Sequence, residues 1–243
     1  MKGVYVEDLT WPEAEAAFKT YSVGVLPVGA RTKEHGHHLP LKNDFVIAEY
    51  LAKRVVETCA IVSLPTLAFG YYPAFVEYPG SVNIRKDVFR DLVCDVCRSV
   101  ARHGLKKIYV LNTGISTNSP LSLAKELLNA EGITFEYTDL TKTLEELKKS
   151  LLTQAAGTHA DELETSMMLY IAPEIVRMER AQRDIHKDNG PGGLTRNPDA
   201  TTGVYSPTGV WGDPTLATRE KGEIYIEALV RELISAVTAL QAV

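Results

Sequence analysis

Half of the six histidines in this sequence lie within four consecutive positions. They belong to residues 33–44, which read Lys-Glu-His-Gly-His-His-Leu-Pro-Leu-Lys-Asn-Asp. Imidazole nitrogens and carboxylate oxygens are the ligands that divalent ions such as Zn, Mn or Fe prefer, and Gly36 lets the backbone turn sharply between them. The pattern predicts a metal site. A solvated polar loop is the alternative, and Asp44 also suits the N-cap of a following helix.

A second polar stretch, residues 112–118, reads Asn-Thr-Gly-Ile-Ser-Thr-Asn. Its amide, hydroxyl and backbone N–H groups suit a polyhydroxylated or carboxylated ligand, which makes Asn112, Ser116 and Thr117 candidates for substrate binding. A plain turn in which Ser119 caps the next helix is the alternative.

A third stretch, residues 159–166, reads His-Ala-Asp-Glu-Leu-Glu-Thr-Ser. If it is helical, His159 and Glu162 share a face at a spacing of three, whereas Glu164 projects differently. Asp161 and Glu162 are also typical of a solvated acidic helix start, which the helix dipole favours.

These stretches need a scaffold, and the hydrophobic pattern predicts one. Short apolar runs at 23–28, 60–64, 108–111 and 133–137 alternate with helical patterns at 10–19, 44–57, 86–102 and 119–131. Buried strands separated by helices indicate an α/β fold with a parallel sheet covered on both faces. Because such sheets bind ligands at the carboxyl ends of their strands, we expect His35 and Asp44 to converge there.

Residues 184–214 are rich in Gly, Pro, Asn and Asp and show little periodicity. A loop of this length in a compact domain is usually functional or mobile. We expect it to cover the active site or to contact another subunit.

Composition limits the remaining possibilities. The 243 residues, 45% hydrophobic and 23% charged, are typical of one globular domain spanning 1–243. A net charge of -5 with scattered Lys and Arg argues against nucleic acid as a partner. Without an apolar run of membrane-span or signal-peptide length, we expect a cytoplasmic protein with no membrane partner. Cys94 and Cys97 fall inside a helical pattern and are expected to be buried core residues.

Four ordered motifs resemble those of one family, the creatininase-like metal-dependent amidohydrolases. Residues 26–29 read Leu-Pro-Val-Gly and lead into His-Gly-His-His-Leu-Pro-Leu and Asp44. Residues 78–82 (Tyr-Pro-Gly-Ser-Val), 159–166 and 209–214 (Gly-Val-Trp-Gly-Asp-Pro) are similar to three further motifs of the family. The resemblance therefore covers most of the chain, from 26 to 214.

The resemblance implies a three-layer α/β/α fold in a cyclic homo-oligomer, often a hexamer. It also implies hydrolysis of C–N bonds in small cyclic or formyl amides at a one- or two-metal centre. By the same resemblance, His35 and Asp44 bind metal, His159 lies beside the substrate, and Glu164 orients the site. Water activated by the metal would attack the carbonyl carbon, while an imidazole passes the proton to the leaving nitrogen.

Two departures from the family pattern change what we expect of the metal. Lys33 holds the position of a metal-binding Glu, so either Glu34 moves into the ligand position or that ligand is lost. Residues 112–118 contain neither the His nor the acid that the family usually places there. One possibility is a single ion held by Glu34, His35 and Asp44, with water or His159 in the fourth place. In the other, the Lys33 ammonium neutralises the carboxylates and leaves a weak metal site or none.

We therefore predict a hydrolase with one divalent ion (Zn, Mn or Fe) per subunit. Its substrate would be a small polar cyclic amide, lactam or related carbonyl compound, and ring-opening of a cyclic ketone is an allied possibility. His159 would act as a proton shuttle. The predicted substrate contacts are Lys33, His38, Asn112, Ser116, Thr117 and Trp211, although Trp211 also suits a packing role. The alternative function is a non-catalytic oligomeric small-molecule binder that has lost part of the metal site.

Overall fold

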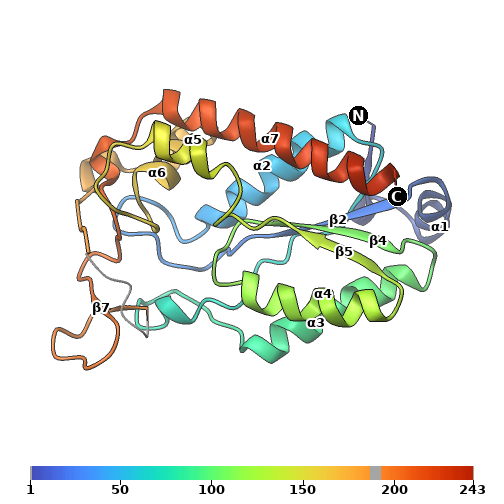
Figure 1. The fold of residues 1–243 in the computed structure, drawn as a ribbon, viewed down its shortest axis with the longest axis horizontal. Helices are drawn as coiled ribbons and strands as arrows, with labels where there is room; N and C mark the ends of the chain where they lie inside the picture. Colours follow the sequence, from blue (N-terminus) through green and yellow to red (C-terminus); the bar gives the residue numbers. More distant parts are fainter. Residues whose placement is uncertain (1, 187–192, 243) are drawn as a thin grey trace.

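The structure is a computed structural model that describes residues 2–186 and 193–242. Its centre is a five-stranded sheet in the order β1-β3-β2-β4-β5, in which every neighbouring pair is parallel (Figure 1). The strands are β1 (Val4–Tyr5), β2 (Val23–Val28), β3 (Val62–Ser63), β4 (Lys107–Asn112) and β5 (Thr134–Tyr137). The predicted parallel sheet is confirmed, and β3 is shorter than the apolar run at 60–64 had indicated.

Helices cover both faces of this sheet and complete the three layers. One face packs against α3 (Lys86–Ala101) and α4 (Asn118–Ala130), and the other against α2 (Asn43–Thr58) and α7 (Arg219–Ala242) (Figure 1). The remaining elements are α1 (Trp11–Thr20), α5 (Glu145–Leu151), α6 (Glu162–Ile171), the strand pair β6 (Leu194–Thr195) and β7 (Val204–Tyr205), and 3-10 turns at Val6–Asp8, Pro73–Phe75, Pro173–Ile175, Met178–Arg180 and Pro214–Leu216.

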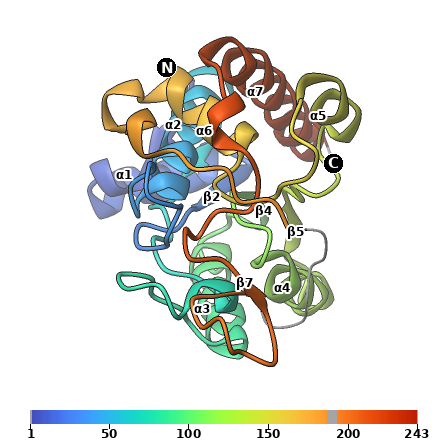
Figure 2. The same cartoon turned by 90° about the vertical axis from the view of Figure 1, so that its left-hand side faces the viewer.

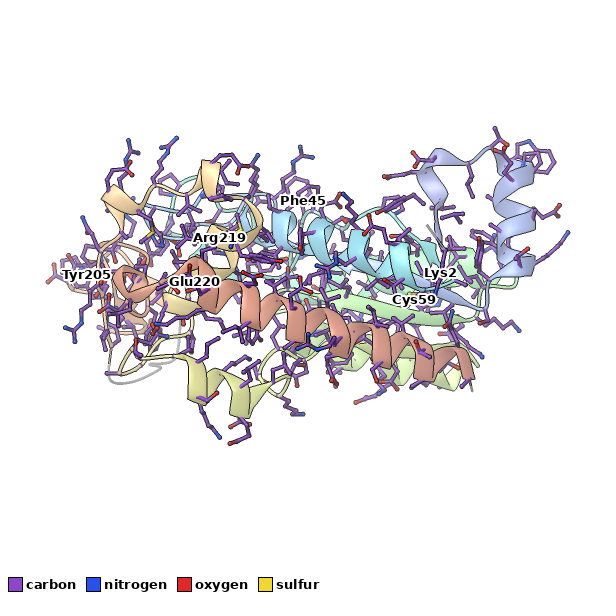
Figure 3. The ribbon with its side chains drawn as sticks, turned by 90° about the horizontal axis from the view of Figure 1, so that it is seen from above. Lys2, Phe45, Cys59, Tyr205, Arg219 and Glu220 are labelled. Carbon is purple, nitrogen blue, oxygen red and sulfur yellow. The ribbon has the colours of Figure 1, made fainter. Side chains whose placement is uncertain are left out.

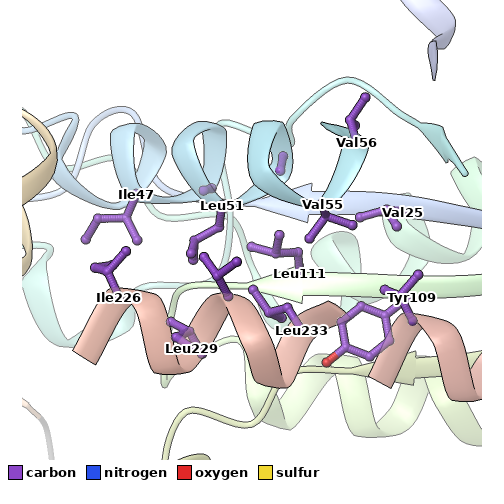
Figure 4. Packing of buried hydrophobic residues seen from close by; sticks show 14 of the residues in the cluster. Val25, Ile47, Leu51, Val55, Val56, Tyr109, Leu111, Ile226, Leu229 and Leu233 are labelled. Atoms are coloured by element: carbon purple, nitrogen blue, oxygen red, sulfur yellow. The ribbon is translucent and has the colours of Figure 1, made fainter. Parts of the chain in front are cut away.

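The core on the α2 and α7 side follows from helical spacing. Ile47, Leu51 and Val55 recur along one face of α2, and Figure 4 shows them facing side chains of α7 such as Leu229 and Leu233. All of these side chains are buried. Burying each of these side chains contributes about 1.5 to 3 kcal/mol to folding. This buried face therefore anchors α2, whose first turn carries Asp44.

The opposite core lies between the sheet and α3 and α4. Phe89, Val93 and Cys97 of α3 are fully buried there against β2 and β4. Cys94 and Cys97 are both free and buried, as the sequence predicted, and burial raises the pKa of both thiols.

Two predicted helix starts are wrong by one or two residues. Asp44 is not an N-cap, because α2 begins at Asn43 and Lys42 occupies the capping position. Ser119 is not one either, because α4 begins at Asn118 after Thr117. Asp44 does not cap the helix because its carboxylate binds two other side chains, His35 and Lys33.

Helix α7 runs along the length of the molecule beside α2 (Figure 3). Arg219 and Glu220 mark its start near α6, and Lys2 and Cys59 lie toward the opposite end. Within residues 2–186 and 193–242, no helix combines the length and apolar character that a membrane crossing requires.

Candidate active site

The site forms at the carboxyl ends of β2 and β4. These strands are adjacent and in register, with Val28 paired to Asn112, so the loops that follow them begin side by side. This end of the molecule lies at the left of Figure 1 and faces the viewer in Figure 2. A pocket of about 520 Å³ opens here, and its lining includes Lys33, His159 and Glu164.

His35 and Asp44 converge beside this pocket, as expected from the sequence. His35 Nε2 lies 2.7 Å from Asp44 Oδ1, and His35 Nδ1–H donates to the backbone carbonyl of Lys33 over 2.9 Å. Both side chains are almost completely buried. The loop therefore fixes both the position and the ring orientation of His35.

Lys33 occupies the other side of the same carboxylate. Its Nζ lies 2.6 Å from Asp44 Oδ2, and it faces the rings of Tyr72 and Phe75 at 5.3 and 5.0 Å from their centroids. Burial by itself would lower the pKa of Lys33, but the carboxylates of Asp44 and Glu164 outweigh burial and raise it. The same ion pair holds the pKa of Asp44 well below its usual range despite burial. Lys33 is therefore a buried, charged ammonium.

Glu34 supports the second imidazole of the site. His159 Nε2–H donates to Glu34 Oε1 over 2.7 Å, and Glu34 Oε2 accepts the backbone N–H of Gly36 over 2.9 Å. Burial would raise the pKa of Glu34, but His159 lowers it; in return Glu34 raises the pKa of His159 against the effect of burial. The Glu34 carboxylate thus orients His159.

The start of α6 positions Glu164, the third side chain of the site. Asp161 is the N-cap residue, and its carboxylate accepts the backbone N–H groups of Leu163 and Glu164. Burial, followed by the charge of Glu164, raises the pKa of Asp161 to about 6. The predicted solvated acidic start is wrong, because Asp161 and Glu162 are buried and Glu162 forms an ion pair with Lys221. Within the first turn of the helix, Glu164 Oε2 lies 3.7 Å from His159 Nδ1.

His35, His159 and Glu164 together fit a metal ion. Each offers one ligand atom, and these atoms lie within 4.8 Å of one another. Bonds of about 2.0 to 2.2 Å keep two ligands of one ion at most about 4.4 Å apart, so small side-chain shifts would close the set. Metal-binding histidines usually donate their other N–H to a carboxylate or a backbone carbonyl. Glu34 and the carbonyl of Lys33 already occupy those positions.

Comparisons with known proteins identify the family of this chain. The family model described as creatinine amidohydrolase matches residues 7–237. The chain belongs to the creatininase family. Creatinine amidohydrolase of Pseudomonas putida is 28% identical over 97% of this chain and 96% of its own length. A 3-dehydro-scyllo-inosose hydrolase of Thermotoga maritima is 27% identical, covering 94% of this chain and 80% of that protein.

Solved structures of the family have the same fold. A creatininase crystal structure superposes with a TM-score of 0.79 at 26% identity, covering 98% of this chain and 97% of that one. Two others, at 25% identity and TM-scores of 0.79, are described as an Mn creatininase and a mutant creatininase of Zn-Zn type; each covers at least 97% of both chains. Creatininase structures therefore carry Mn or Zn, and the predicted three-layer fold is confirmed.

The structure brings together some, but not all, of the residues predicted for a creatininase-like site. Lys33, Ser116, His159, Glu164 and Trp211 line the pocket. Three other predicted substrate contacts do not line it, namely His38, Asn112 and Thr117. Predicted as a metal ligand, Glu34 instead bonds His159 and the backbone of Gly36 and lies outside the group formed by His35, His159 and Glu164.

The residues that do not line the pocket have structural contacts instead. His38 is buried and its Nε2 bonds the Thr165 hydroxyl over 2.8 Å, while burial followed by the charge of His35 lowers its pKa to about 4. Asn112 accepts a hydrogen bond of 2.6 Å from Thr117, which shapes the turn after β4. These side chains are committed to holding the loops.

Several pocket residues escaped the sequence analysis because they are apolar or come from unremarkable loops. Tyr72 and Phe75 were not predicted, and they belong to one buried cluster with Trp211 beside the site. Tyr72 and Phe75 precede the Tyr-Pro-Gly-Ser-Val motif at 78–82, and that proximity is the only signal in the sequence that could have found them.

The segment predicted to cover the site does so in part. His159 and Trp211 pair through their backbones, with Trp211 N–H donating to the His159 carbonyl over 2.8 Å. Gly193 and Leu194 also line the pocket. Residues 187–192 of this segment lie outside the described residues, and the expected subunit contact stays a prediction.

Proposed function

We propose that this protein is a hydrolase that uses one divalent metal ion to split a C–N bond next to a carbonyl group. The observation that carries the proposal is the group formed by His35, His159 and Glu164 at the wall of the pocket. Membership of the creatininase family supports the reaction class. When bound, a divalent ion supplies Lewis acidity and lowers the pKa of water.

The chain's own residues prepare the pocket for this chemistry. His159 and Glu164 line the pocket, and His35 is buried beside them. An ion held by the three would therefore lie at the pocket wall, where His159 and Glu164 meet the substrate. Lys33 also lines the pocket, and its charge would stabilise negative charge that develops on a carbonyl oxygen. The rings of Tyr72 and Phe75 lie next to the ammonium, and the burial of Lys33 limits the access of bulk water to it.

The pocket walls extend the predicted substrate class. Beyond the polar end, the lining is largely apolar and includes Ile47, Leu51, Met167, Tyr225 and Leu229. A volume of about 520 Å³ is within the usual range of small-molecule pockets and exceeds what a small polar ring would fill. We propose a cyclic amide, a lactam or a related carbonyl compound that carries an apolar substituent.

One variant separates the two roles that His159 could have. The sequence predicted a proton shuttle, whereas the structure groups His159 with His35 and Glu164, so we propose that it binds the ion. His159→Ala should then lose the metal, measured by elemental analysis after dialysis. His37→Ala removes an exposed histidine from the same loop as His35 and should retain the metal. If His159→Ala retains the metal but loses turnover by about a hundredfold or more, the role in proton transfer is correct.

A non-catalytic binder remains the second candidate because Lys33 already pairs with Asp44. If the protein is the proposed hydrolase, the purified protein should contain metal and should hydrolyse the ring C–N bond of at least one compound in a panel of N-substituted lactams and hydantoins. A metal-free protein that binds these compounds without turnover would support the binder.

We also propose a homo-oligomer. Trp11 is 80% exposed and Val76 57% exposed, and large exposed apolar residues are common where subunits meet. Light scattering coupled to size-exclusion chromatography should give a mass above 26.8 kDa. A monomer would contradict this proposal without affecting the proposed chemistry.

A further inference from the structure

We propose that the Lys33 ammonium takes the place of one metal ion in this centre, so that the protein binds a single divalent ion beside a built-in cation. This inference rests on the proposed function, because it assumes an ion at His35, His159 and Glu164. The positive charges of the centre are then one ion and the Lys33 ammonium, and Asp44 is the partner of that ammonium.

The contacts of Asp44 carry the first part of the argument. Oδ1 lies 2.7 Å from His35 Nε2, and Oδ2 lies 2.6 Å from Lys33 Nζ. With the residue 1% exposed, no face of the carboxylate is open to solvent. An ion that approached Oδ2 would have to displace the ammonium, which cation–π attraction to the Tyr72 and Phe75 rings stabilises in its position.

The charges in the centre carry the second part. Glu34, Asp44 and Glu164 contribute three carboxylates, and Lys33 contributes one ammonium. An ion that binds His35 Nε2 displaces the proton that this nitrogen shares with Asp44, so both imidazoles are then neutral and the sum is two negative charges, which one divalent ion neutralises. Asp161 also lines the pocket, but its carboxylate is held by backbone N–H groups at the start of α6 and its charge is offset by the Lys148 ammonium, which lines the same pocket. Buried charges are tolerated only when they are paired, so this balance favours one ion over two.

The lack of further metal ligands in residues 112–118 carries the third part. One solved creatininase is described as Zn-Zn type, which names two zinc ions in that protein. In this chain residues 112–118 contain no His, Asp or Glu, and a cation occupies position 33 next to Asp44. A second ion would therefore find no imidazole or carboxylate in residues 112–118 and would meet the ammonium beside Asp44.

Counting ions per subunit tests the inference. Wild-type protein and Lys33→Glu would be loaded with Zn²⁺ or Mn²⁺, dialysed, and measured by elemental analysis. We expect one ion in the wild type and two in Lys33→Glu, because this variant removes the ammonium and adds a carboxylate beside Asp44. Lys33→Arg keeps the positive charge and should bind one ion. Two ions in the wild type, or no gain in Lys33→Glu, would overturn the inference.

A charge-neutral variant tests Asp44 separately in case Lys33→Glu fails to fold. The double variant Lys33→Met/Asp44→Asn removes both charges of a buried pair, which proteins often tolerate. If Lys33 and Asp44 neutralise each other, the double variant should still bind one ion, with an affinity within about tenfold of the wild type. Loss of that ion would mean that Asp44 is a ligand and would overturn the inference.

Failure of the proposed function gives a different result. A wild type that binds no ion contradicts the metal-dependent hydrolase. In that case, an ion gained by Lys33→Glu would still support the exclusion of metal by Lys33, and no gain would overturn it.

Discussion

Gly209→Ala should weaken the site although Gly209 is not a proposed ligand. Gly209 has a φ of +72°, and a Cβ atom there would lie 2.1 Å from Glu34 Oε2. The left-handed backbone costs an alanine about 1 to 2 kcal/mol. The carboxylate must in addition retreat by about 1 Å to restore a normal contact distance. Gly36 N–H and His159 hold that carboxylate, so its retreat disturbs the His159 hydrogen bond.

The expected consequences can be measured without a substrate. Loss of a carboxylate that orients a metal-binding histidine typically weakens metal binding by about 10- to 100-fold. The pKa of His159 should also fall, because the Glu34 charge and hydrogen bond raise it in the wild type. Isothermal titration with Zn²⁺ would measure the first effect, and an NMR titration of the imidazole C–H resonances of the metal-free protein would measure the second.

Gly132→Ala is the matched control. Gly132 has a φ of +77°, and an added Cβ would meet nothing within 4 Å. Gly132→Ala should lose about 1 to 2 kcal/mol of stability, or about 2 to 8 °C in Tm, and Gly209→Ala should lose more because of its added contact with Glu34. Only Gly209→Ala should change the metal affinity and the His159 pKa. Equal behaviour of the two variants in both measurements would refute the role given to Glu34.

Three further predictions concern stability. Because burial lowers the pKa of His38 from 6.5 to about 4, protonating it in the folded state costs about 3 kcal/mol. That stability is present above about pH 6.5 and is lost as the pH falls toward 4, so urea unfolding of His38→Gln should depend less on pH in this range than the wild type. Lys221→Met leaves the buried Glu162 carboxylate without its ammonium and should cost about 3 kcal/mol in the same assay; an unchanged urea midpoint would contradict the pairing. In Gly222→Ala the new Cβ would lie 1.9 Å from the Ser166 carbonyl oxygen, so forcing α6 and α7 apart should lower the Tm by at least about 6 °C in calorimetry, and a Tm unchanged within 2 °C would show that the two helices separate freely.

The sheet and the approximate site were predictable because short-range patterns determine them. The apolar runs that became β2 and β4 are fully or almost fully buried, and their polar continuations after Val28 and Asn112 emerge together. Parallel pairing makes that convergence a consequence of topology. The motifs at 35–44 and 159–166 then named the groups that converge, although not their contacts.

The contacts of the charged residues were not predictable in the same way. Whether Lys33 faces solvent or Asp44 depends on the rings of Tyr72 and Phe75, which follow it by about forty positions. Glu34 binds His159, 125 positions further along the chain. Local spacing carries no information on such pairs, so the sequence left open whether Lys33 or Glu34 enters the metal centre.

The acidic start of α6 illustrates the same limit. Two consecutive acidic residues such as Asp161 and Glu162 are typical of a solvated helix start. Burial there depends on α7, whose Lys221 pairs with Glu162 from 59 positions away. The sequence could predict the helix but not what covers it.

The position of α7 along the chain has a consequence for biosynthesis. Every strand of the central sheet precedes Arg219, yet α7 supplies Ile226, Leu229 and Leu233 to the core on one sheet face. During translation that face, with the apolar side of α2, stays partly uncovered until α7 has left the ribosome. Transiently exposed apolar surface makes nascent chains prone to aggregation and dependent on chaperones. Truncation within α7 should therefore reduce soluble yield in cells, even though the loops of the candidate site would already be complete.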